Sequence, residues 1–390
     1  MLFLILFYLT IVNSQYFIHI TDIHYDPLYA PGSPTNCWLG DTGLGCCRKD
    51  SVPLNPPGNA SIWGDFNCDS PYLLVKNTID WIRNNLNYDF VIYTGDTVNH
   101  HDLSQNWDSN FKDITNITYL LQTMKTPVYH VLGNHDSFLV DQLYTVSPVV
   151  SDVGSLWDND TITNGARIQN FTQGGFYKTT LPSGINLCGI NSLWYDSNNL
   201  AVIADPTGDI GGQFEWMKEN VNGCFLIGHI APTSGEASTQ YDKFMLTVNL
   251  THELYGHTHS DEYIIVNSSY GLRVGWMPAS VVPNNHFPAF RRFKYMIKNE
   301  SMVILDYEEY HHNLTRQQTL PEDKFIGYEI TYTALNEYGL KDMSAGEWWN
   351  LALRMVYNDT LLGIYCKNNN YPNTTCVRED LLCGINQSLC

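Results

Sequence analysis

Five short motifs, each ending on an oxygen or nitrogen that can bind a metal, occur along this 390-residue chain. They are Asp22-Ile23-His24, Gly95-Asp96, Gly133-Asn134-His135-Asp136, Gly228-His229 and Gly256-His257-Thr258-His259. Nearly all follow an apolar, strand-like run; the runs span residues 16–20, 90–93, 128–132, 225–227 and, less clearly, 253–255. A ligand at the end of a strand is held by the sheet, and the glycine beside it lets the backbone turn sharply. The pattern predicts a sheet that carries these side chains at the carboxyl ends of its strands.

The ligand types in these motifs are aspartate, asparagine and histidine. Together they suit a pair of divalent cations. Any one motif alone is more often a loop histidine or a helix cap than a metal ligand. The five in this order have no comparable structural explanation, and they predict a two-metal hydrolase.

The elements expected around the motifs alternate strands with helices. After the strand at 16–20, a loop from Tyr25 to Asp69, rich in proline, glycine and cysteine, precedes a helix that opens at Ser70-Pro71. A strand at 89–93, a helix at 106–124 and a strand at 127–132 follow. Later strands are expected at 175–180, 185–193, 224–230, 253–255, 263–267, 273–276 and 302–310, with helices at 212–220 and 345–357. This rhythm predicts a mixed sheet with helices outside it.

The motif order resembles that of the calcineurin-like metallophosphoesterases, and more closely that of acid sphingomyelinase and the acid sphingomyelinase-like phosphodiesterases. The resemblance covers nearly the whole chain after its first fifteen or so residues. It also includes Asp22–Pro27, Cys46-Cys47-Arg48, Thr94-Gly95-Asp96 with His100, Gly256–Glu262, Leu305–Glu308, and Tyr338-Gly339-Leu340 followed by Trp348 and Arg354.

The resemblance implies an α/β fold, namely a four-layer α/β/β/α sandwich of two mixed sheets with a small C-terminal helical subdomain. We expect a signal peptide at 1–14, a catalytic domain at 16–315 and a helical, disulfide-bonded subdomain at 316–390.

The resemblance also assigns seven metal ligands. One metal takes Asp22, His24 and His259, the other takes Asn134, His229 and His257, and Asp96 bridges both. Two cations about 3.5–4 Å apart need such a shared anion. The histidine-rich shell favours Zn²⁺, with Mn²⁺ second. Iron is argued against, because purple acid phosphatases place a tyrosine three residues after the bridging aspartate, where this chain has Asn99.

Two histidines are expected to do the proton chemistry. The family pattern points the ring of His135 at the substrate phosphate, with Asp136 as an acceptor that could hold it. An imidazole near its ordinary pKa of about 6.5 suits an acid for the leaving oxygen. His100 matches the second catalytic histidine of the sphingomyelinase group, although the adjacent His101 could face the site instead. The other histidines assigned to packing or the surface are His19, His252, His286, His311 and His312.

Three aromatic residues, Tyr25, Trp194 and Tyr195, are candidate walls for a substrate head group, through cation–π contact or base stacking. A structural role for them is at least as well supported, because the chain is 13% aromatic.

The ten cysteines form an even set, which favours disulfides. Cys46 and Cys47 are adjacent and cannot easily bond to each other, so Cys37–Cys46 and Cys47–Cys68 is the economical pairing. Two more, Cys188 and Cys224, lie on or beside expected strands and could join them. The remaining set closes the tail in an order that the spacing leaves open: Cys366, Cys376, Cys383 and Cys390. A zinc–thiolate site competes with this reading, but no C-x-x-C pair occurs and the metal motifs are already rich in histidine.

Export from the cytosol is indicated by two further features. Residues 1–14 are apolar and end in small polar residues, which predicts a signal peptide cleaved near Ser14 or Gln15; a buried helix would leave no room before the strand at Tyr16. Eleven N-x-S/T triplets predict heavy glycosylation of a secreted or lysosomal protein. Their asparagines are Asn59, Asn116, Asn159, Asn170, Asn249, Asn267, Asn299, Asn313, Asn358, Asn373 and Asn386.

The charge pattern restricts the partners. A net charge of −19 excludes a nucleic-acid polymer, because no basic run could neutralise its phosphates. The densest basic pair, Arg291-Arg292, is explained as a solvated strand end. After the signal, no transmembrane segment or lipid-anchor tail is expected, since no later apolar run is long enough and the end from Gly384 to Cys390 is polar.

We therefore expect a phosphodiesterase that cleaves a small-molecule or lipid phosphodiester, such as sphingomyelin to ceramide and phosphocholine, with a metal-bound hydroxide. A nucleotide or CDP-choline phosphodiesterase is the alternative, because the six-cysteine saposin pattern of acid sphingomyelinase does not occur in this sequence. A glycoprotein that binds phosphocholine or nucleotides without turnover is a weaker alternative, because every ligand position is filled.

Overall fold

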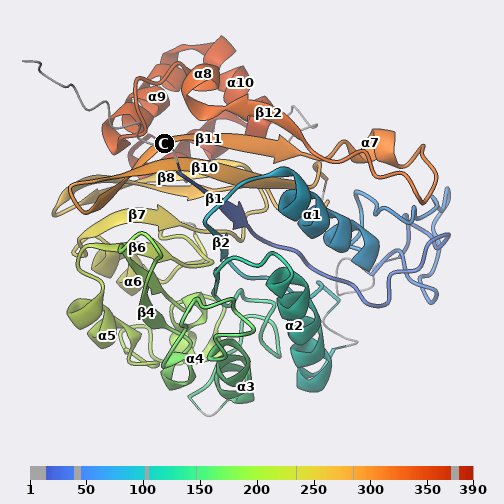
Figure 1. The fold of residues 1–390 in the computed structure, drawn as a ribbon, viewed down its shortest axis with the longest axis horizontal. Coiled ribbons are helices and arrows are strands. Elements are labelled where there is room, and N and C mark those ends of the chain that lie inside the picture. The colour runs from blue at the N-terminus through green and yellow to red at the C-terminus, as the bar shows by residue number, and fades with distance from the viewer. Residues whose placement is uncertain are drawn as a thin grey trace, which may run out of the picture.

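The computed structural model describes residues 15–38, 45–101, 105–145, 147–233, 235–283, 285–369 and 377–389. The expected signal peptide at 1–14 lies outside these described residues. Two six-stranded sheets form the centre of the molecule (Figure 1). The expected sandwich of two mixed sheets with helices is confirmed, and so is a helical C-terminal region.

The first sheet has the strand order β12-β11-β10-β1-β2-β3. The parallel part is β1, β2 and β3, and the other strands add to it antiparallel. The bounds are β1 (Gln15–Ile20), β2 (Phe90–Tyr93), β3 (Val128–His130), β10 (Ala289–Lys298), β11 (Ser301–His311) and β12 (Glu329–Thr333).

The second sheet has the strand order β4-β5-β6-β7-β9-β8. Strands β5, β6, β7 and β9 run parallel, while β4 and β8 are antiparallel edges. The bounds are β4 (Tyr177–Thr180), β5 (Asn186–Gly189), β6 (Cys224–Ile227), β7 (Leu250–Leu254), β8 (Glu262–Ser268) and β9 (Gly271–Met277).

Alternate residues of β1 pack on opposite faces of the first sheet, as a strand buried on both sides requires. Phe17 points between the sheets, with its ring 5.8 Å from that of Phe225 in β6. Its neighbour Ile18 belongs to a second cluster with Val75 and Ile79 of α1 (Tyr72–Asn85). The core therefore has one layer between the sheets and another under the outer helices.

The outer helices begin where the sequence provides a start signal. Helix α1 follows Pro71, and α2 (Trp107–Gln122) begins with a capping box between Asn106 and Ser109. On the second sheet, α5 (Gln213–Asn220) and α6 (Thr239–Met245) contribute to a further cluster. The remaining helices before the C-terminal part are α3 (Pro148–Trp157) and α4 (Leu200–Ala204).

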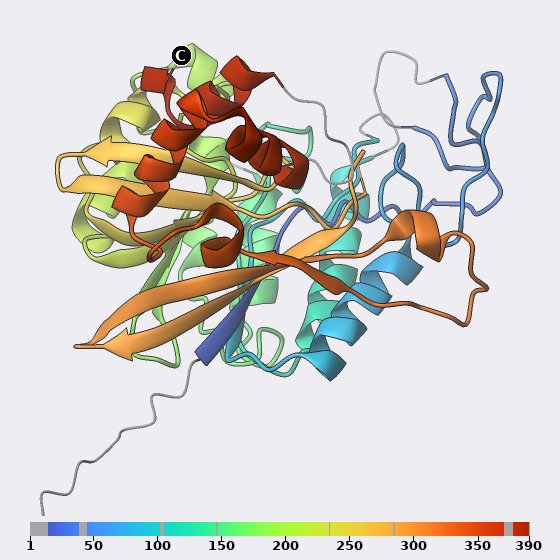
Figure 2. The same ribbon diagram turned by 90° about the horizontal axis from the view of Figure 1, so that it is seen from above.

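The last four helices gather on one side of the molecule, next to β8 and β11 (Figures 1 and 2). They are α8 (Ala334–Tyr338), α9 (Ala345–Tyr357), α10 (Asp359–Asn369) and α11 (Arg378–Ile385). The short helix α7 (Leu314–Gln317) lies apart from them, and its Leu314 packs with Trp63. Trp348 of α9 is fully buried, with its ring 4.6 Å from that of Tyr263 in β8. Strand β12 lies beyond the expected boundary at residue 315, yet it pairs with β11 in the first sheet. The domain boundary stays a prediction.

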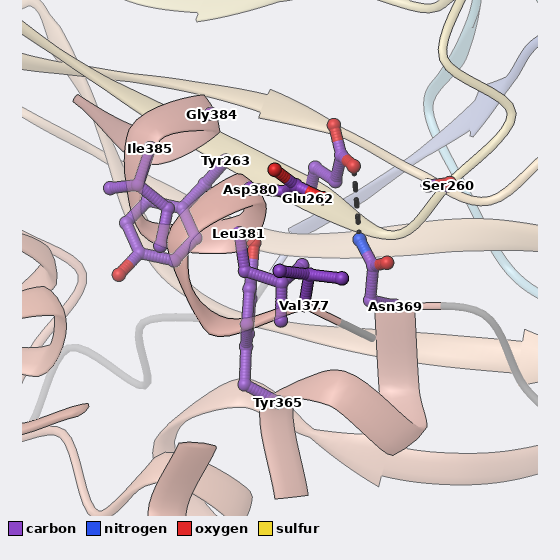
Figure 3. A pocket seen from close by; sticks show the side chains of 10 residues that line it. All are labelled: Ser260, Glu262, Tyr263, Tyr365, Asn369, Val377, Asp380, Leu381, Gly384 and Ile385. Atoms are coloured by element: carbon purple, nitrogen blue, oxygen red, sulfur yellow. Dashed lines mark hydrogen bonds between the residues drawn. The ribbon is translucent and has the colours of Figure 1, made fainter. Parts of the chain in front are cut away.

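A cavity of about 260 Å³ lies between β8 and the C-terminal helices (Figure 3). Tyr365 of α10 and Leu381 of α11 contribute to its walls, and the amide of Asn369 donates to the carboxylate of Glu262. The cavity therefore belongs to the contact between the C-terminal helices and the second sheet.

Strand β10 was not expected from the sequence, and the assignment of Arg291 to a solvated strand end is wrong. Arg291 is fully buried, and its guanidinium donates to Glu309 and Asp261, each at 2.6 Å. Both carboxylates lie well outside the sequence around the arginine pair, 18 and 30 residues from Arg291. The local sequence therefore could not indicate that Arg291 forms buried ion pairs. The ion pairs join β10 and β11 to the segment that follows His259.

The predicted disulfides Cys37–Cys46, Cys47–Cys68 and Cys188–Cys224 are all present. The last joins the neighbouring strands β5 and β6. In the tail, Cys366 and Cys383 are disulfide-bonded, while Cys376 and Cys390 lie outside the described residues.

Candidate metal centre

The motif residues stand on loops that leave parallel strands at one edge of the sandwich. Asp22 and His24 follow β1, Asp96 follows β2, and Asn134 follows β3. From the second sheet, His229 follows β6, and the pair His257 and His259 follows β7. The sheets thereby bring together side chains that are up to 237 residues apart, from Asp22 to His259.

Five of the seven expected ligands have a left-handed backbone, which is rare for residues other than glycine. Their φ angles are 49° for Asp22, 41° for His24, 59° for Asp96, 76° for His257 and 59° for His259. Such a conformation costs on the order of 1 kcal/mol or more and persists where surrounding structure enforces it. Strain concentrated on these residues is typical of a functional site.

Two glycines allow the loops after β2 and β3 to meet. A Cβ on Gly133 would overlap the carboxylate of Asp96, and one on Gly95, whose φ is +94°, would overlap the backbone of Gly133. Only glycine permits this approach, which places Asp96 beside the Asn134 loop.

The first group of side chains is formed by Asp22, His24, Asp96 and His259, whose ligand atoms all lie within 4.8 Å of one another. Nε2 of His24 is 3.0 Å from Nε2 of His259 and 3.4 Å from Oδ2 of Asp96. Nε2 of His259 is also 3.4 Å from Oδ1 of Asp22. Nitrogen and oxygen atoms converging in this way suit one divalent cation.

The second group is formed by Asp96, His229 and His257, also within 4.8 Å, and Asn134 joins it. Oδ1 of Asn134 is 3.0 Å from Nε2 of His229 and 3.1 Å from Nδ1 of His257. The same Asp96 oxygen that faces His24 is 3.2 Å from Nε2 of His229. Asp96 is therefore common to both groups, as the ligand assignment requires.

Backbone carbonyls fix the orientation of two histidine rings. Nδ1 of His24 is 2.8 Å from the carbonyl oxygen of Val98, and Nδ1 of His229 is 2.7 Å from that of Thr94. Each Nδ1–H donates to a carbonyl, so Nε2 is the ring atom left to bind a metal.

The carboxylates stay ionised although they are buried. Burial alone would raise the pKa of Asp96, but the neighbouring His229 and His135 outweigh it and hold the pKa well below its usual range. Asp22 behaves likewise, because hydrogen bonds from His24 and His259 oppose burial and lower its pKa. Both side chains are thus suited to bind cations.

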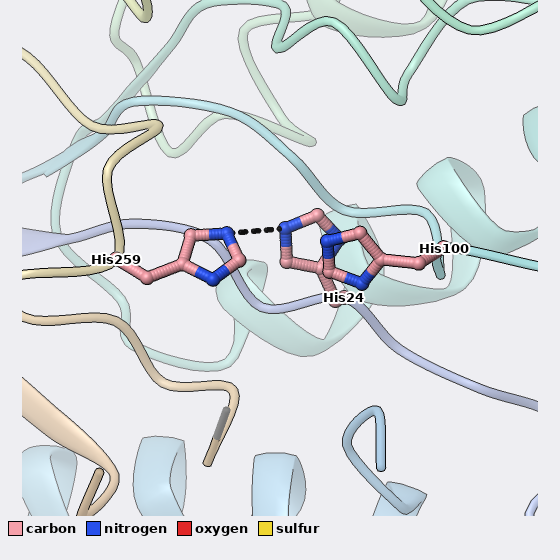
Figure 4. Close-up of side chains that lie close together, drawn as sticks. All are labelled: His24, His100 and His259. Carbon is pink, nitrogen blue, oxygen red and sulfur yellow. Dashed lines mark hydrogen bonds between the residues drawn. The ribbon is translucent and has the colours of Figure 1, made fainter. Parts of the chain in front are cut away.

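His100, and not His101, lies against the metal-ligand rings. Its ring stacks on that of His24, with 3.7 Å between centroids (Figure 4). The ring of His135 is 4.5 Å away from it. Nδ1 of His100 is 2.6 Å from Oδ1 of Asp69, so the opposite nitrogen, Nε2, is left to act in the site. Burial would raise the pKa of Asp69, but the charge and hydrogen bond of His100 hold it at about 2.

His135 lies beside His24, with 5.1 Å between ring centroids, and its backbone N–H donates to Asp96. Burial and the neighbouring His100 lower its pKa well below the ordinary value that the sequence suggested. Asp136 does not support the ring in the expected way. Its carboxylate accepts the backbone N–H groups of Gly133, Asp96 and Thr97, and so ties the two loops together.

Two of the three expected aromatic walls are core residues. Tyr195 is fully buried and stacks on Tyr241, and Trp194 is buried and donates to the carbonyl of Gly174. Tyr25 alone is half-buried, and it lines a cavity of about 410 Å³ together with Tyr72. The five histidines assigned to packing or the surface are buried or half-buried. One of them, His19, forms a hydrogen bond between its Nε2 and the hydroxyl of Thr94.

Three carboxylates beside the site were not expected. Asp69 holds His100, Asp141 accepts from the amide of Asn134 at 2.8 Å, and Glu236 contacts His257 at 2.6 Å. None stands in a metal motif. Only Asp69 had a signal in the sequence, because it directly follows Cys68, and the predicted disulfide of Cys68 fixes its position.

This chain is similar to known phosphoesterases. Residues 16–261 match the sequence model of the calcineurin-like phosphoesterases. Sphingomyelin phosphodiesterase A of Dictyostelium discoideum is 26% identical, over 90% of this chain and 62% of that protein. Cyclic GMP-AMP phosphodiesterase SMPDL3A of Rattus norvegicus is 27% identical, over 88% of this chain and 81% of that protein. Human sphingomyelin phosphodiesterase is 25% identical, over 87% of this chain and 57% of that protein.

This chain therefore matches less than two thirds of the length of both sphingomyelin phosphodiesterases. Among solved structures, a dimetal phosphatase from Danio rerio has a TM-score of 0.43 and 12% identity, covering 76% of this chain and 95% of that one.

Proposed function

Because this chain belongs to the family of calcineurin-like phosphoesterases, we propose that it is a two-metal phosphodiesterase. Its proposed substrate is a small-molecule or lipid phosphodiester such as sphingomyelin, cleaved to ceramide and phosphocholine. The observation that carries the proposal is the pair of ligand groups that share Asp96. A single metal site would need no such shared carboxylate.

In this proposal Asp22, His24 and His259 hold one cation, Asn134, His229 and His257 hold the other, and Asp96 bridges them. When bound, two cations polarise the phosphoryl oxygens and supply the nucleophile at neutral pH. Zn²⁺ is the proposed metal because four of the seven ligands are histidines, with Mn²⁺ second.

His135 and His100 act on the substrate without binding metal. We assign protonation of the leaving oxygen to His135, and binding of the phosphate or a share in that proton transfer to His100. The contact with Asp69 supports the second role, because it fixes the ring of His100 and directs Nε2 away from the carboxylate. Asp136 keeps the loops of Asp96 and Asn134 at a fixed separation through its backbone contacts.

A nucleotide or CDP-choline substrate is the second candidate. Cyclic GMP-AMP phosphodiesterases are among the relatives of this chain, and the rat protein is 27% identical over 81% of its length. Tyr25 directly follows His24 and, with Tyr72, lines a cavity in which a base could stack. Both candidates are phosphodiesters, and the same metal chemistry serves either.

A secreted or lysosomal location is proposed with this activity. Disulfides persist in oxidising compartments, and three are present between described residues. Ten of the eleven sequon asparagines lie in the described part of the chain, and each of those ten is exposed or half-exposed. Along the described helices, no stretch is long and apolar enough to cross a membrane.

Turnover by the purified, glycosylated protein tests the proposal. The bound metal is first counted by mass spectrometry, and hydrolysis of sphingomyelin, CDP-choline, ATP and bis-nitrophenyl phosphate is then compared from pH 4.5 to 7.5. We expect two metal ions for each chain and a higher kcat/KM for one phosphodiester class. A metal-loaded protein that binds phosphocholine or nucleotides without turnover would be a binding protein instead.

A further inference from the structure

Glu236 lies on the loop between β6 and α6 and contacts a candidate metal ligand from outside. Its Oε2 is 2.6 Å from Nε2 of His257. Charged hydrogen bonds of this length are the strong ones. The side chain of Glu236 is 48% exposed, whereas that of His257 is 15% exposed. The glutamate therefore covers the histidine on the open side of the site.

The contact determines which nitrogen of His257 can bind a metal. An ionised carboxylate only accepts hydrogen bonds, so Nε2 of His257 must donate. Nδ1 then carries the lone pair, and it is the atom that faces Oδ1 of Asn134 at 3.1 Å. His24 and His229 show the reverse arrangement, because backbone carbonyls accept from their Nδ1 atoms. His257 thus differs from these two in having a charged partner.

The two ligand groups also differ in charge. The first contains Asp22, whereas the second has only neutral ligands besides the shared Asp96. Two of the three carboxylates beside the site lie behind the second group, with Asp141 on Asn134 and Glu236 on His257. A carboxylate behind a ligating histidine raises the basicity of the ring and fixes its orientation.

We propose that Glu236 is a positioning residue for the second metal, which it stabilises by fixing the tautomer of His257 and adding negative charge behind it. The inference rests on the proposed metal ligands and adds to them a side chain outside the five motifs.

Metal affinity is the direct readout. Glu236→Gln keeps an acceptor for Nε2 but removes the charge, and Glu236→Ala removes both. Each purified variant is dialysed against Zn²⁺ buffers of graded free concentration, and bound zinc is counted. We expect the second zinc to bind about 10- to 100-fold more weakly in Glu236→Gln and at least as weakly in Glu236→Ala, with the first zinc unchanged. The matched control is Glu219→Gln, an exposed glutamate of α5.

A double-mutant cycle separates this role from a general effect on the loop. In a His257→Asn background the ligand ring is already gone, so Glu236→Gln should weaken the second zinc much less than it does in the parent protein. Thermal unfolding of the metal-free proteins checks that both variants fold. Unchanged affinity for the second zinc in Glu236→Gln, or an equal loss in the His257→Asn background, would overturn the inference. A parent protein that binds no zinc or only one would instead refute the proposed two-metal site.

Discussion

The carboxylate of Asp69 forms two hydrogen bonds with His100: Oδ1 is 2.6 Å from ring Nδ1, and Oδ2 accepts the backbone N–H at 2.9 Å. The carboxylate comes from the disulfide-rich loop, directly after Cys68, which is bonded to Cys47. A loop without regular secondary structure thus supplies the residue that orients a candidate catalytic ring.

Asp69→Asn should lower kcat on the order of 100-fold, because the amide cannot accept at both points and the ring of His100 is released. Both metals should stay bound, since Asp69 is outside the ligand groups. Steady-state kinetics with metal counting makes the measurement, and Asp65→Asn in the same loop is the control. His100→Ala should reproduce the loss and His101→Ala should not. Full activity of Asp69→Asn would show that the hydrogen bonds between Asp69 and His100 have no part in catalysis.

His135→Ala should keep both metals and slow turnover, because His135 is not a proposed ligand. The deficit should be largest for alkoxide leaving groups and smaller for nitrophenolate esters, which need little protonation. Kinetics on the two substrate types makes the comparison. Equal losses on both types, with metals intact, would remove His135 from the acid role and leave it as an electrostatic clamp.

Asp113→Asn should stabilise the protein at high pH. Burial raises the pKa of Asp113 to about 7 from an ordinary 3.8, and the nearby Asp26 adds to this. Between these values the folded state holds a proton that the unfolded state releases, so stability falls as pH rises from about 4 to 7. Each unit of the pKa difference between the folded and unfolded states is worth about 1.4 kcal/mol of unfolding free energy. The variant can therefore gain at most about 4 kcal/mol in its free energy of unfolding at high pH.

The measurement for Asp113→Asn is the free energy of unfolding at pH 4 and pH 8. The difference from the parent protein should be near zero at pH 4 and positive at pH 8. Asp108→Asn, at an exposed position of α2, is the control and should show no such trend. A constant difference at both pH values would mean that Asp113 ionises normally.

The protein from its natural host should begin near Gln15, carry N-glycans and show no free thiol when denatured without reductant. N-terminal sequencing, glycosidase treatment and thiol titration before and after reduction make the three checks. An unglycosylated cytosolic protein with ten reactive cysteines would contradict the proposed compartment.

The sequence predicted the main features of the fold and the convergence of the motif residues, because each motif directly follows a buried strand. Asp22 and Asp96 follow the neighbouring parallel strands β1 and β2, which end at the same edge of one sheet. His229 follows β6 of the other sheet, and the packing of the two sheets brings it to them. Helix α9 was predicted at its observed bounds from the strongly apolar run at residues 345–357.

The features that the sequence missed depend on partners far along the chain. Strand β10 contains Arg291, whose charge indicated a solvated position in the sequence. In the structure it is buried and paired with Glu309 and Asp261. Trp194 looked available to a substrate but fills the core. Glu236 stands in an ordinary loop sequence, and only the fold brings it to His257.

The shared carboxylate is the centre of this account, and Asp96→Asn tests it most directly. The variant and the parent protein are purified side by side, loaded with Zn²⁺, and assayed for metal content and for hydrolysis of bis-nitrophenyl phosphate. We predict two zinc ions in the parent, loss of both in the variant, and nearly complete loss of turnover, because one side chain serves both sites. Normal zinc content in Asp96→Asn would contradict the ligand assignment and the two-metal mechanism built on it.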